Sequence, residues 1–537
     1  MSKPMEAPAG GLVPVSTRVM NLANFLTQAA RRFPHEDALV MGNNTLTWQS
    51  LDQRVSALTL ALRAQGIKKG DRILVHSRNG FEMIETQLAA FRLGAVWAPA
   101  NFRISPDESK WLAELTAARV LIIGAEFEDH CNAMFEASPS LAFTVRIGEG
   151  SFGDVDYESF LREHEGQACH NADVQHDDPC WFFFTSGTTG RSKAAVLTHG
   201  QMGFVTTNHL CDLMPGTDHA TDASLVIAPL SHGSGIHYLP QLARGVKTVL
   251  PSESGFNADE IWQLIEHHRI TNIFTVPTIV KMLVEDPAVD HYDRSSLRYI
   301  IYAGAPMYRA DQKFALEKLG NVLVQYYGLG EVTGNITVLP PVLHSASDDE
   351  MKTGTCGYDR TAMQVSIQDD AGNELAPSET GEICVCGLGV FAGYYANPEA
   401  NEKSFRDGWF RTGDLGHIDD EGFLYITGRA SDMFISGGSN IYPREIEEKM
   451  LTHPGIREVA IIGMPDNHWG EVGVAAIVPV EGKTLDAETL RKWIKTKVSG
   501  YKVPHRYHFF DDLPKSNYGK ITKKIIKQAI EEREKLS

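Results

Sequence analysis

Apolar residues in the first part of the chain recur at two spacings, which predict alternating helices and strands. From residue 20 to residue 33 they lie at helical intervals, and Pro34 is expected to end that helix. Helices are likewise predicted at 51–62, 81–93 and 112–117, and strands at 72–76, 96–100 and 119–123. Such alternation predicts an α/β fold, layered and with mostly parallel sheets.

A polar loop stands between two apolar runs in the middle of the chain. The runs, 181–184 and 194–197, are typical of buried strands. Glycines let backbone N–H groups close around an anion, while hydroxyls and a lysine add donors and charge. The loop is therefore predicted to hold a polyphosphate, although a Gly/Thr-rich hairpin without a ligand is the alternative. Its candidate residues are Thr185, Ser186, Gly187, Thr188, Thr189, Gly190 and Lys193.

Further apolar runs end in glycine-rich turns downstream. Residues 228–237 indicate a strand end that breaks into a turn around His232 and Gly233, and the nearby His237 is not followed by a third ligand at zinc spacing. Strands are predicted at 299–303, before Gly304, and at 323–327, before Gly328.

The last hundred residues are predicted to form a small α+β domain. A glycine-rich loop at 436–443 precedes helices at 444–451 and 487–498 and strands at 459–463, 472–480 and 506–510. A final helix follows, which is predicted to place four apolar side chains on one face. They are Ile525, Ile526, Ala529 and Ile530.

Composition and charge narrow the classes of function. The 537 residues predict two to four domains, and 43% hydrophobic and 22% charged residues are ordinary for a globular protein. A formal net charge of −18 disfavours nucleic acid as a partner. No apolar run is long enough for a membrane span or a signal-peptide core, so no stable membrane insertion and a cytoplasmic location are expected. The seven cysteines are scattered, and Cys384 and Cys386 are expected to be thiols in a strand.

The order of these motifs resembles the adenylate-forming superfamily, which contains acyl-CoA synthetases, the adenylation domains of peptide synthetases, and firefly luciferase. The polar loop resembles the phosphate loop of that family, and the segment 513–521 resembles its catalytic-lysine loop, with Lys520 as the lysine. The resemblance covers nearly the whole chain. It implies ATP, Mg²⁺ and coenzyme A as ligands, with a small carboxylic acid as the substrate, and it leaves a homodimer possible.

The resemblance also implies roles for individual residues. Gly304, Ala305 and Pro306 would form an adenine slot with Gln325, Tyr326, Tyr327 and Gly328, and Glu331 would be both catalytic and the Mg²⁺ ligand. Asp414, with Arg429 beside it, would accept hydrogen bonds from the ribose hydroxyls. An acyl pocket is expected at His232, Gly233, Tyr302 and Leu329, although His232 could instead only cap a turn.

The family uses one active site twice, by rotating a small domain. This implies an N-terminal ATP- and acyl-binding domain at 1–431 and a mobile C-terminal domain at 432–537, with the hinge at Asp432. Gly437 and Gly438 would approach a coenzyme A tunnel after the rotation. Four residues depart from the usual pattern: Ser192 in place of a proline, Ala194 in place of a glycine, Gly330 in place of a threonine, and Ser431 in place of a lysine. Because the family has threonine there, a Gly330→Thr variant is expected to be tolerated.

Three kinds of activity fit these motifs. A stand-alone acyl-CoA synthetase is favoured over an enzyme that loads a carrier protein, since no carrier motif follows, and over a luciferase-type oxygenase. A nucleotide-binding protein without catalysis is the remaining alternative. No arginine occurs at 232–237 or 327–335 to pair a second carboxylate, so an aromatic, hydroxycinnamate-like or medium-chain monocarboxylic acid is expected.

Overall fold

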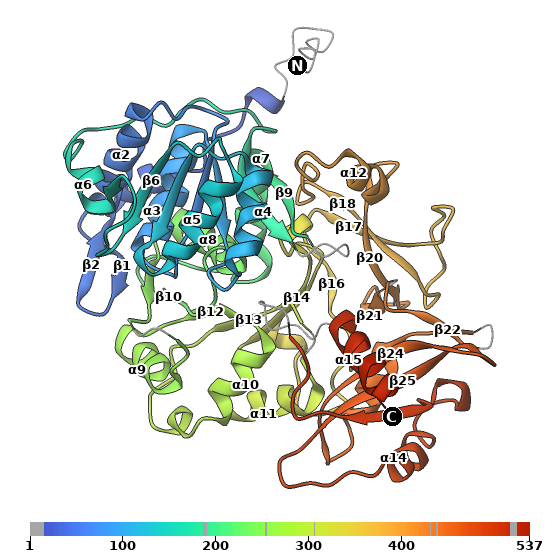
Figure 1. Ribbon diagram of the computed structural model, residues 1–537. Helices are drawn as coiled ribbons and strands as arrows, with labels where there is room; N and C mark the ends of the chain where they lie inside the picture. Colours follow the sequence, from blue (N-terminus) through green and yellow to red (C-terminus); the bar gives the residue numbers. More distant parts are fainter. Residues whose placement is uncertain are drawn as a thin grey trace, which may run out of the picture.

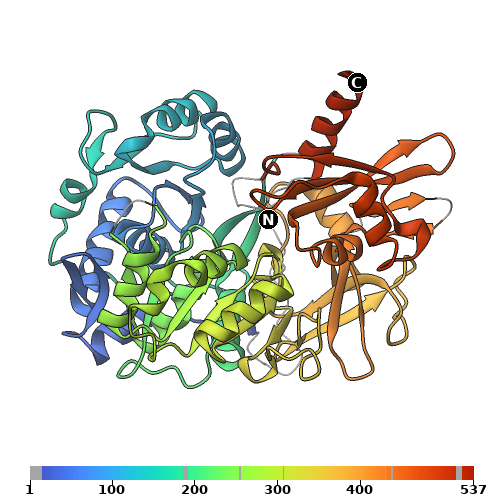
Figure 2. The same cartoon turned by 90° about the horizontal axis from the view of Figure 1, so that it is seen from below.

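The computed structural model describes residues 15–185, 191–252, 255–305, 307–429, 431–436, 439–515 and 523–536. Within these ranges the strands form four sheets, two of them large and mostly parallel and two smaller (Figure 1). The chain fills the two large sheets first and the smaller sheets afterwards, as the colours from blue to red show in Figures 1 and 2. A mostly parallel α/β N-terminal region and a smaller C-terminal domain are thus confirmed.

The first large sheet has seven strands and contains the strand before the polar loop. Its order is β7 (Val155–Asp156), β6 (Phe143–Ile147), β5 (Val120–Gly124), β3 (Arg72–His76), β4 (Val96–Ala100), β8 (Pro179–Thr185) and β9 (Lys193–Thr198). The strands from β7 to β8 are parallel, while β8 and β9 are antiparallel. Helices α3 (Phe81–Leu93), α4 (Pro106–Thr116) and α5 (Glu128–Ala137) connect its parallel strands.

The second large sheet has nine strands. Its order is β16 (Tyr358–Asp359), β15 (Thr337–Leu339), β14 (Leu323–Tyr327), β13 (Tyr299–Tyr302), β12 (Asn272–Thr275), β10 (Ala223–Val226), β11 (Lys247–Leu250), β1 (Asp37–Met41) and β2 (Asn44–Thr47). The central strands from β14 to β1 are parallel, and the outer ones are antiparallel. Parallel strands are buried on both faces, which explains their continuous apolar runs.

Helices cover both faces of the two large sheets. One core joins the sheets through α1 (Asn24–Arg32), α2 (Trp48–Ala64), α3, α7 (His199–Asp212) and α8 (Gly233–Arg244). The outer face of the seven-stranded sheet packs on α4 and α5. The outer face of the nine-stranded sheet packs on α9 (Ala258–His268), α10 (Pro277–Glu285) and α11 (Arg309–Leu319). The N-terminal region therefore has alternating layers of helix and sheet.

Two smaller sheets follow. The first contains β17 (Met363–Gln368), β18 (Gly381–Gly387), β19 (Phe405–Arg406), β20 (Trp409–Ile418) and β21 (Leu424–Arg429), with helix α12 (Pro398–Ser404) beside it. The second contains β22 (Phe434–Ser436), β23 (Ser439–Ile441), β24 (Ile456–Asp466), β25 (Gly470–Pro479) and β26 (Arg506–Phe509). Helices α13 (Pro443–Met450), α14 (Ala487–Ile494) and α15 (Lys523–Leu536) pack on the second sheet, around two cores of its own.

Most predicted elements occur where the sequence places them, with three differences. The segment 436–443, predicted to be a glycine-rich loop, contains strand β23. The predicted strands at 72–76 and 96–100 and the predicted helix at 81–93 match the bounds of β3, β4 and α3. The glycine-rich turn predicted after His232 is wrong, because helix α8 begins at Gly233. The predicted apolar face of α15 is partly wrong, since Ile526 and Ile530 are buried but Ile525 is 46% exposed.

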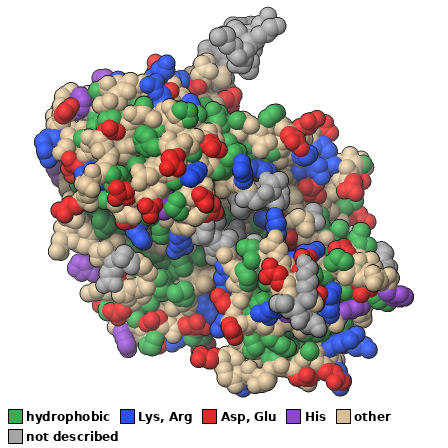
Figure 3. Space-filling view, viewed as in Figure 1, with side chains coloured by type: hydrophobic (Ala, Val, Ile, Leu, Met, Phe, Trp, Pro, Cys, Tyr) green, Lys and Arg blue, Asp and Glu red, His purple; other side chains and the backbone are tan. Residues whose placement is uncertain are grey.

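Acidic and basic side chains are interspersed over the face of the molecule shown in Figure 3. Among the described residues, no helix has the length and apolar character needed to cross a membrane.

Candidate active site

The end of β8 brings the first phosphate-loop candidates together. Thr185 and Lys193 are paired across the antiparallel β8 and β9 ladder, so the loop leaves and re-enters the sheet at one point. Lys193 Nζ lies 4.5 Å from the centre of the Tyr394 ring, a cation–π contact. The other candidates, Ser186, Gly187, Thr188, Thr189 and Gly190, lie outside the described residues.

Glu331 lies on a short 3₁₀ turn just after β14, only 6% exposed. Its Oε1 accepts a hydrogen bond of 2.8 Å from the hydroxyl of Tyr394, and its backbone carbonyl accepts another from Phe391 N–H. Burial and the nearby Glu331 carboxylate raise the pKa of Tyr394, so its hydroxyl stays protonated and donates.

The carboxylate of Glu331 suits a hard cation such as Mg²⁺ that also binds phosphate oxygens. Tyr394 engages one oxygen of the carboxylate, and the other can serve as a Mg²⁺ ligand. Among the described residues, no group of three or more His, Cys, Asp or Glu side chains could hold a metal ion. A Mg²⁺ at Glu331 would therefore take further ligands from phosphate oxygens and water, as Mg²⁺ commonly does.

Asp414 is a buried carboxylate on β20 with partners from two other strands. Its Oδ2 accepts a hydrogen bond of 2.6 Å from the hydroxyl of Tyr327, at the end of β14. Its Oδ1 lies 3.2 Å from Nε of Arg429, its partner in the β20–β21 ladder. Burial, followed by the charge of Asp414, raises the pKa of Tyr327 well above its usual value, so this hydroxyl remains a donor. The arrangement presents a pre-oriented anionic acceptor of the kind that two vicinal hydroxyls can bind.

The turns after β13 and β14 keep their backbone open to a flat ligand. Gly304 has φ +84°, and it and Ala305 are exposed, while Pro306 lies outside the described residues. At Gly328 an added Cβ would lie 2.4 Å from Gly334 Cα, so only glycine lets these two turns approach so closely.

The ring of Phe183 leaves no room for a side chain at Gly330. A Cβ at Gly330 would lie 2.6 Å from the Phe183 ring and 2.9 Å from Thr185 Cγ2. The expectation that threonine would be tolerated here is therefore wrong. The reason is steric and not conformational, because Gly330 does not have a positive φ. Phe183 also makes an edge contact with the His232 ring, with the ring centres 5.2 Å apart.

The residues expected to line the acyl pocket separate into two groups. His232 and Gly233 lie together at the start of α8, where a Cβ on Gly233 would lie 2.4 Å from the Phe274 ring, and the partly buried Leu329 packs against the core that contains α8. Tyr302 lies instead in the core on the outer face of the nine-stranded sheet. Its hydroxyl there contacts Gln325 at 3.0 Å.

Tyr326 faces away from Gln325, toward a buried aromatic and basic cluster that the sequence did not reveal. We call this set the histidine cluster, and it consists of His209, His237, Phe274, Tyr326 and Arg360. Tyr326 OH lies 3.4 Å from Nε2 of His237, and His209 Nδ1 lies 3.3 Å from a guanidinium nitrogen of Arg360. Burial lowers the pKa of both histidines well below its usual value, which keeps both rings neutral.

Asp432 connects the two smaller sheets. Its backbone N–H donates to the carbonyl of Arg429 at 3.0 Å, and its carboxylate lies 3.8 Å from Nζ of Lys523 on α15. The remaining candidates of this region, Gly437, Gly438 and Lys520, lie outside the described residues.

Comparison with known proteins identifies the class. The model of the AMP-binding enzyme family matches residues 26–395, and that of the AMP-binding enzyme C-terminal domain matches residues 445–520. The chain therefore belongs to the AMP-binding enzyme family, as the motifs indicated, and is a ligase of the acyl-CoA synthetase type.

Particular relatives cover nearly all of the chain. A feruloyl-CoA synthase from an Amycolatopsis species is 35% identical over 95% of this chain and 99% of the relative. An indoleacetate–CoA ligase from Aromatoleum aromaticum is 33% identical over 95% of this chain and 98% of the relative. The o-succinylbenzoate CoA synthetase of Bacillus subtilis, solved with its acyl-adenylate intermediate, superimposes with a TM-score of 0.81 at 29% identity, covering 94% of this chain and 98% of that one.

Proposed function

We propose that the protein joins a carboxylic acid to coenzyme A in two steps on one site. ATP first converts the acid to an acyl-adenylate with release of pyrophosphate, and the thiol of coenzyme A then displaces AMP. The observation that carries this proposal is a pair of contacts at the carboxyl ends of β8 and β14: Lys193 and Glu331 both contact Tyr394, and Asp414 accepts a hydrogen bond from Tyr327 at the end of β14. Ligands bind outside the carboxyl ends of parallel strands in open α/β sheets.

Adenylation makes a poor electrophile reactive. A carboxylate would have to expel oxide, but attack of its oxygen on the α-phosphorus of ATP turns that oxide into AMP. Both reactants are anionic, so the transition state gathers negative charge that needs fixed counter-charges. Lys193 and Lys520 supply two of them, and a Mg²⁺ bound at Glu331 would neutralise phosphate oxygens.

Apart from Lys193, the nucleotide is held by residues that do not take part in the chemistry. The phosphate loop, Thr185 to Lys193, binds the phosphates, Gly304 to Pro306 and Tyr327 bind the adenine, and Asp414 binds the ribose. Tyr394 holds the carboxylate of Glu331 in place and is therefore a positioning residue.

Thioester formation follows a rotation of the domain 432–537 against the domain 1–431 about Asp432. Lys520 lies beyond the hinge, so the rotation carries it away from the phosphate loop. In the same movement Gly437 and Gly438 approach the pantetheine arm of coenzyme A, whose thiolate attacks the acyl carbon while AMP leaves.

The acid is a monocarboxylic acid, either aromatic or of medium chain length. Relatives named for ferulate and indoleacetate support the aromatic class. A relative 32% identical over 95% of this chain, named as a long-chain fatty acid CoA ligase, keeps an aliphatic acid as the second candidate.

The test separates the two half-reactions. Acid-dependent exchange of labelled pyrophosphate into ATP is measured with a panel of aromatic and aliphatic acids, and acyl-CoA formation is then measured with the best acid. Exchange followed by thioester formation is expected. Exchange without coenzyme A transfer would indicate another acceptor, such as the carrier protein that the name of one relative specifies. Absence of exchange with every acid would indicate a nucleotide-binding protein without this chemistry.

A further inference from the structure

Helix α4 carries a tryptophan that contacts the chain where the phosphate loop re-enters the sheet. The helix begins at a capping box between Ser105 and Glu108, with a proline in its first turn. Its Leu112 is buried in the core on the outer face of the seven-stranded sheet, and the partly buried Trp111 packs against the same core. Trp111 therefore extends from a well-anchored helix.

Two contacts join Trp111 to the end of the phosphate loop. The indole Nε1–H donates a hydrogen bond of 2.8 Å to the backbone carbonyl of Ser192, and the guanidinium of Arg191 lies over the indole ring, 4.7 Å from its centre. The accepting carbonyl belongs to the peptide unit that links Ser192 to Lys193. Because a peptide unit is planar, a contact that holds its oxygen also restricts the backbone from which the Lys193 side chain starts.

The backbone at residue 192 needs a restraint from outside the loop. Serine leaves φ open, whereas the proline that the family usually has at this position would fix φ near about −65°. The space beside the contact is open as well, because a hollow of about 250 Å³ is lined by α4 and by residues 191–193 and 395–397. Packing on that side is therefore weak, and the hydrogen bond from Trp111 supplies the restraint.

The restrained backbone leads directly into the candidate site. Lys193 Nζ lies 4.5 Å from the centre of the Tyr394 ring, whose hydroxyl donates to the carboxylate of Glu331. The same segment is tied to β9, since the N–H of Tyr395 donates to the carbonyl of Ala194 at 2.9 Å. The attraction between a lysine and a phosphate depends on the distance between their charges. A shift of the backbone at residue 193 would therefore weaken the contact of Lys193 with the phosphates.

We propose that Trp111 is a positioning residue for ATP, which holds the Ser192 carbonyl and thereby sets the place of Lys193 at the polyphosphate. The inference rests on the proposed function and adds to it a residue on the outer face of the sheet. Trp111 acts in the first half-reaction, because the β- and γ-phosphates are present only there. The second half-reaction starts from the acyl-adenylate, after pyrophosphate has left, and does not need this restraint.

The variant Trp111→Phe tests the proposal on the full-length enzyme, since it removes the indole N–H and keeps an aromatic ring for the core and for Arg191. In pyrophosphate exchange at saturating acid, its kcat/KM for ATP is expected to fall by about 3- to 10-fold, the effect of losing one hydrogen bond. Conversion of a supplied acyl-adenylate to thioester should keep its wild-type rate. A general loss of folded enzyme would instead lower both half-reactions in the same proportion.

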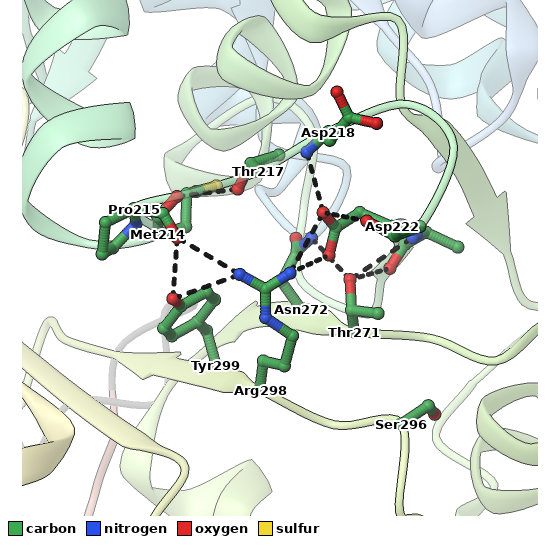
Figure 4. Close-up of polar contacts among 12 residues, drawn as sticks. Met214, Pro215, Thr217, Asp218, Asp222, Thr271, Asn272, Ser296, Arg298 and Tyr299 are labelled. Carbon is green, nitrogen blue, oxygen red and sulfur yellow. Dashed lines mark hydrogen bonds and ion pairs between the residues drawn. The ribbon is translucent and has the colours of Figure 1, made fainter.

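Tyr299, at the amino end of β13, provides a matched control (Figure 4). Its hydroxyl also donates to a backbone carbonyl at 2.8 Å, that of Pro215, and the guanidinium of Arg298 lies 5.1 Å from the centre of its ring. Tyr299→Phe therefore removes the same kind of bond from the same kind of aromatic and arginine pair. The candidate site lies at the carboxyl ends of the strands, so this variant should keep the wild-type rates of both half-reactions.

Three results would overturn the role of Trp111. They are an unchanged kcat/KM for ATP in Trp111→Phe, equal losses in its two half-reactions, and an equal loss in Tyr299→Phe. In each case the wild type still exchanges pyrophosphate, so the proposed function would stand. If the wild type shows no exchange with any acid, the proposed function is wrong, and calorimetric titration with ATP alone then tests Trp111. The Kd for ATP should rise by the same factor in Trp111→Phe, and an unchanged Kd would overturn the proposal.

Discussion

Asp414 is held from two sides, by the hydroxyl of Tyr327 and the guanidinium of Arg429, and it is only 7% exposed. We expect Asp414→Ala to raise the KM for ATP by roughly 10- to 150-fold, because ribose hydroxyls would lose a charged acceptor worth about 1.5–3 kcal/mol. Steady-state kinetics at saturating acid measure this effect.

Asp419 provides a matched control for that variant. It lies near the other end of the β20–β21 hairpin and makes analogous contacts, with the hydroxyl of Tyr425 at 3.2 Å and Nζ of Lys352 at 3.0 Å. Asp419→Ala should leave the KM for ATP unchanged. If both variants raise it equally, Asp414 acts through the stability of the hairpin and not through the nucleotide.

Single residues of the candidate site could be proposed from the sequence only where a local motif carries them. Glu331 and Asp414 follow from their neighbours in the chain, but Tyr394 is 63 residues from Glu331 and no local pattern connects them. The alternation of side chains along a strand explains why the roles of Gln325 and Tyr326 could not be predicted. Gln325 and Tyr326 are adjacent in sequence, so a strand sends them to opposite faces, and the sequence does not reveal which face the site occupies.

Phe183 on β8 and Gly330 after β14 show how two elements constrain each other. We expect Gly330→Thr to lower the free energy of unfolding by about 1–3 kcal/mol, because the new side chain would overlap the ring of Phe183. Chemical denaturation measures the loss. Gly500, whose Cβ position is open and whose φ is negative, gives a control variant, Gly500→Thr, with little expected effect.

A double-mutant cycle shows whether the ring is the cause. In a Phe183→Ala background the same Gly330→Thr change should destabilise less, by at least about 1 kcal/mol, since removing the ring makes room. Additive losses would mean that Thr185 or the backbone, and not Phe183, limits position 330.

Helix α8 explains why one element escaped prediction. It begins Gly233-Ser234-Gly235 and contains Pro240, all poor helix formers, so its sequence indicates a turn. Packing overrides that tendency. Ile236, Leu239 and Leu242 are buried in the core between the large sheets, and a Cβ on Gly235 would lie only 2.2 Å from the carbonyl oxygen of Leu230. By contrast, β3, α3 and β4 have strong local patterns that agree with their tertiary surroundings.

At the scale of the whole molecule, the layered fold was predictable from the alternation of helices and strands, because short crossovers between parallel strands leave few topologies. The docking of the segment around Tyr394 onto Glu331 and β9 was not predictable, since it depends on contacts between regions far apart in the chain.

Buried neutral histidines make the stability of the whole fold depend on pH. Burial lowers the pKa of His76 to about 3, and that of His199 and His344 to about 4. In the unfolded chain these rings take up protons near pH 6.5. Their contribution is therefore complete above about pH 6.5 and is lost as the pH falls toward about 4 to 3.

The expected result is a free energy of unfolding that decreases as the pH falls from about 6.5 to 5, above the range where most carboxylates titrate. Each histidine adds up to about 1.4 kcal/mol per pH unit to the slope of the free energy of unfolding against pH. His76→Phe should remove one such increment. Denaturant titrations at several pH values measure the slopes, and equal slopes for wild type and His76→Phe would contradict this account.

The last prediction concerns which half-reaction depends on Lys520 and which depends on rotation about Asp432. If Lys520 serves adenylation alone, Lys520→Ala should suppress acid-dependent pyrophosphate exchange but still convert a supplied acyl-adenylate to thioester when coenzyme A is added.

Asp432→Pro should do the reverse, because proline fixes φ near about −65° and a hinge works by changing its backbone dihedrals. Proline also removes the N–H that bonds to Arg429, and the Asp432 carboxylate lies near Lys523, so Asp432→Ala is the control that loses the carboxylate and keeps the N–H. A defect confined to thioester formation in Asp432→Pro and absent from Asp432→Ala would assign it to the backbone. If Lys520→Ala and Asp432→Pro lose the same half-reaction, rotation about Asp432 does not separate the two steps in this enzyme.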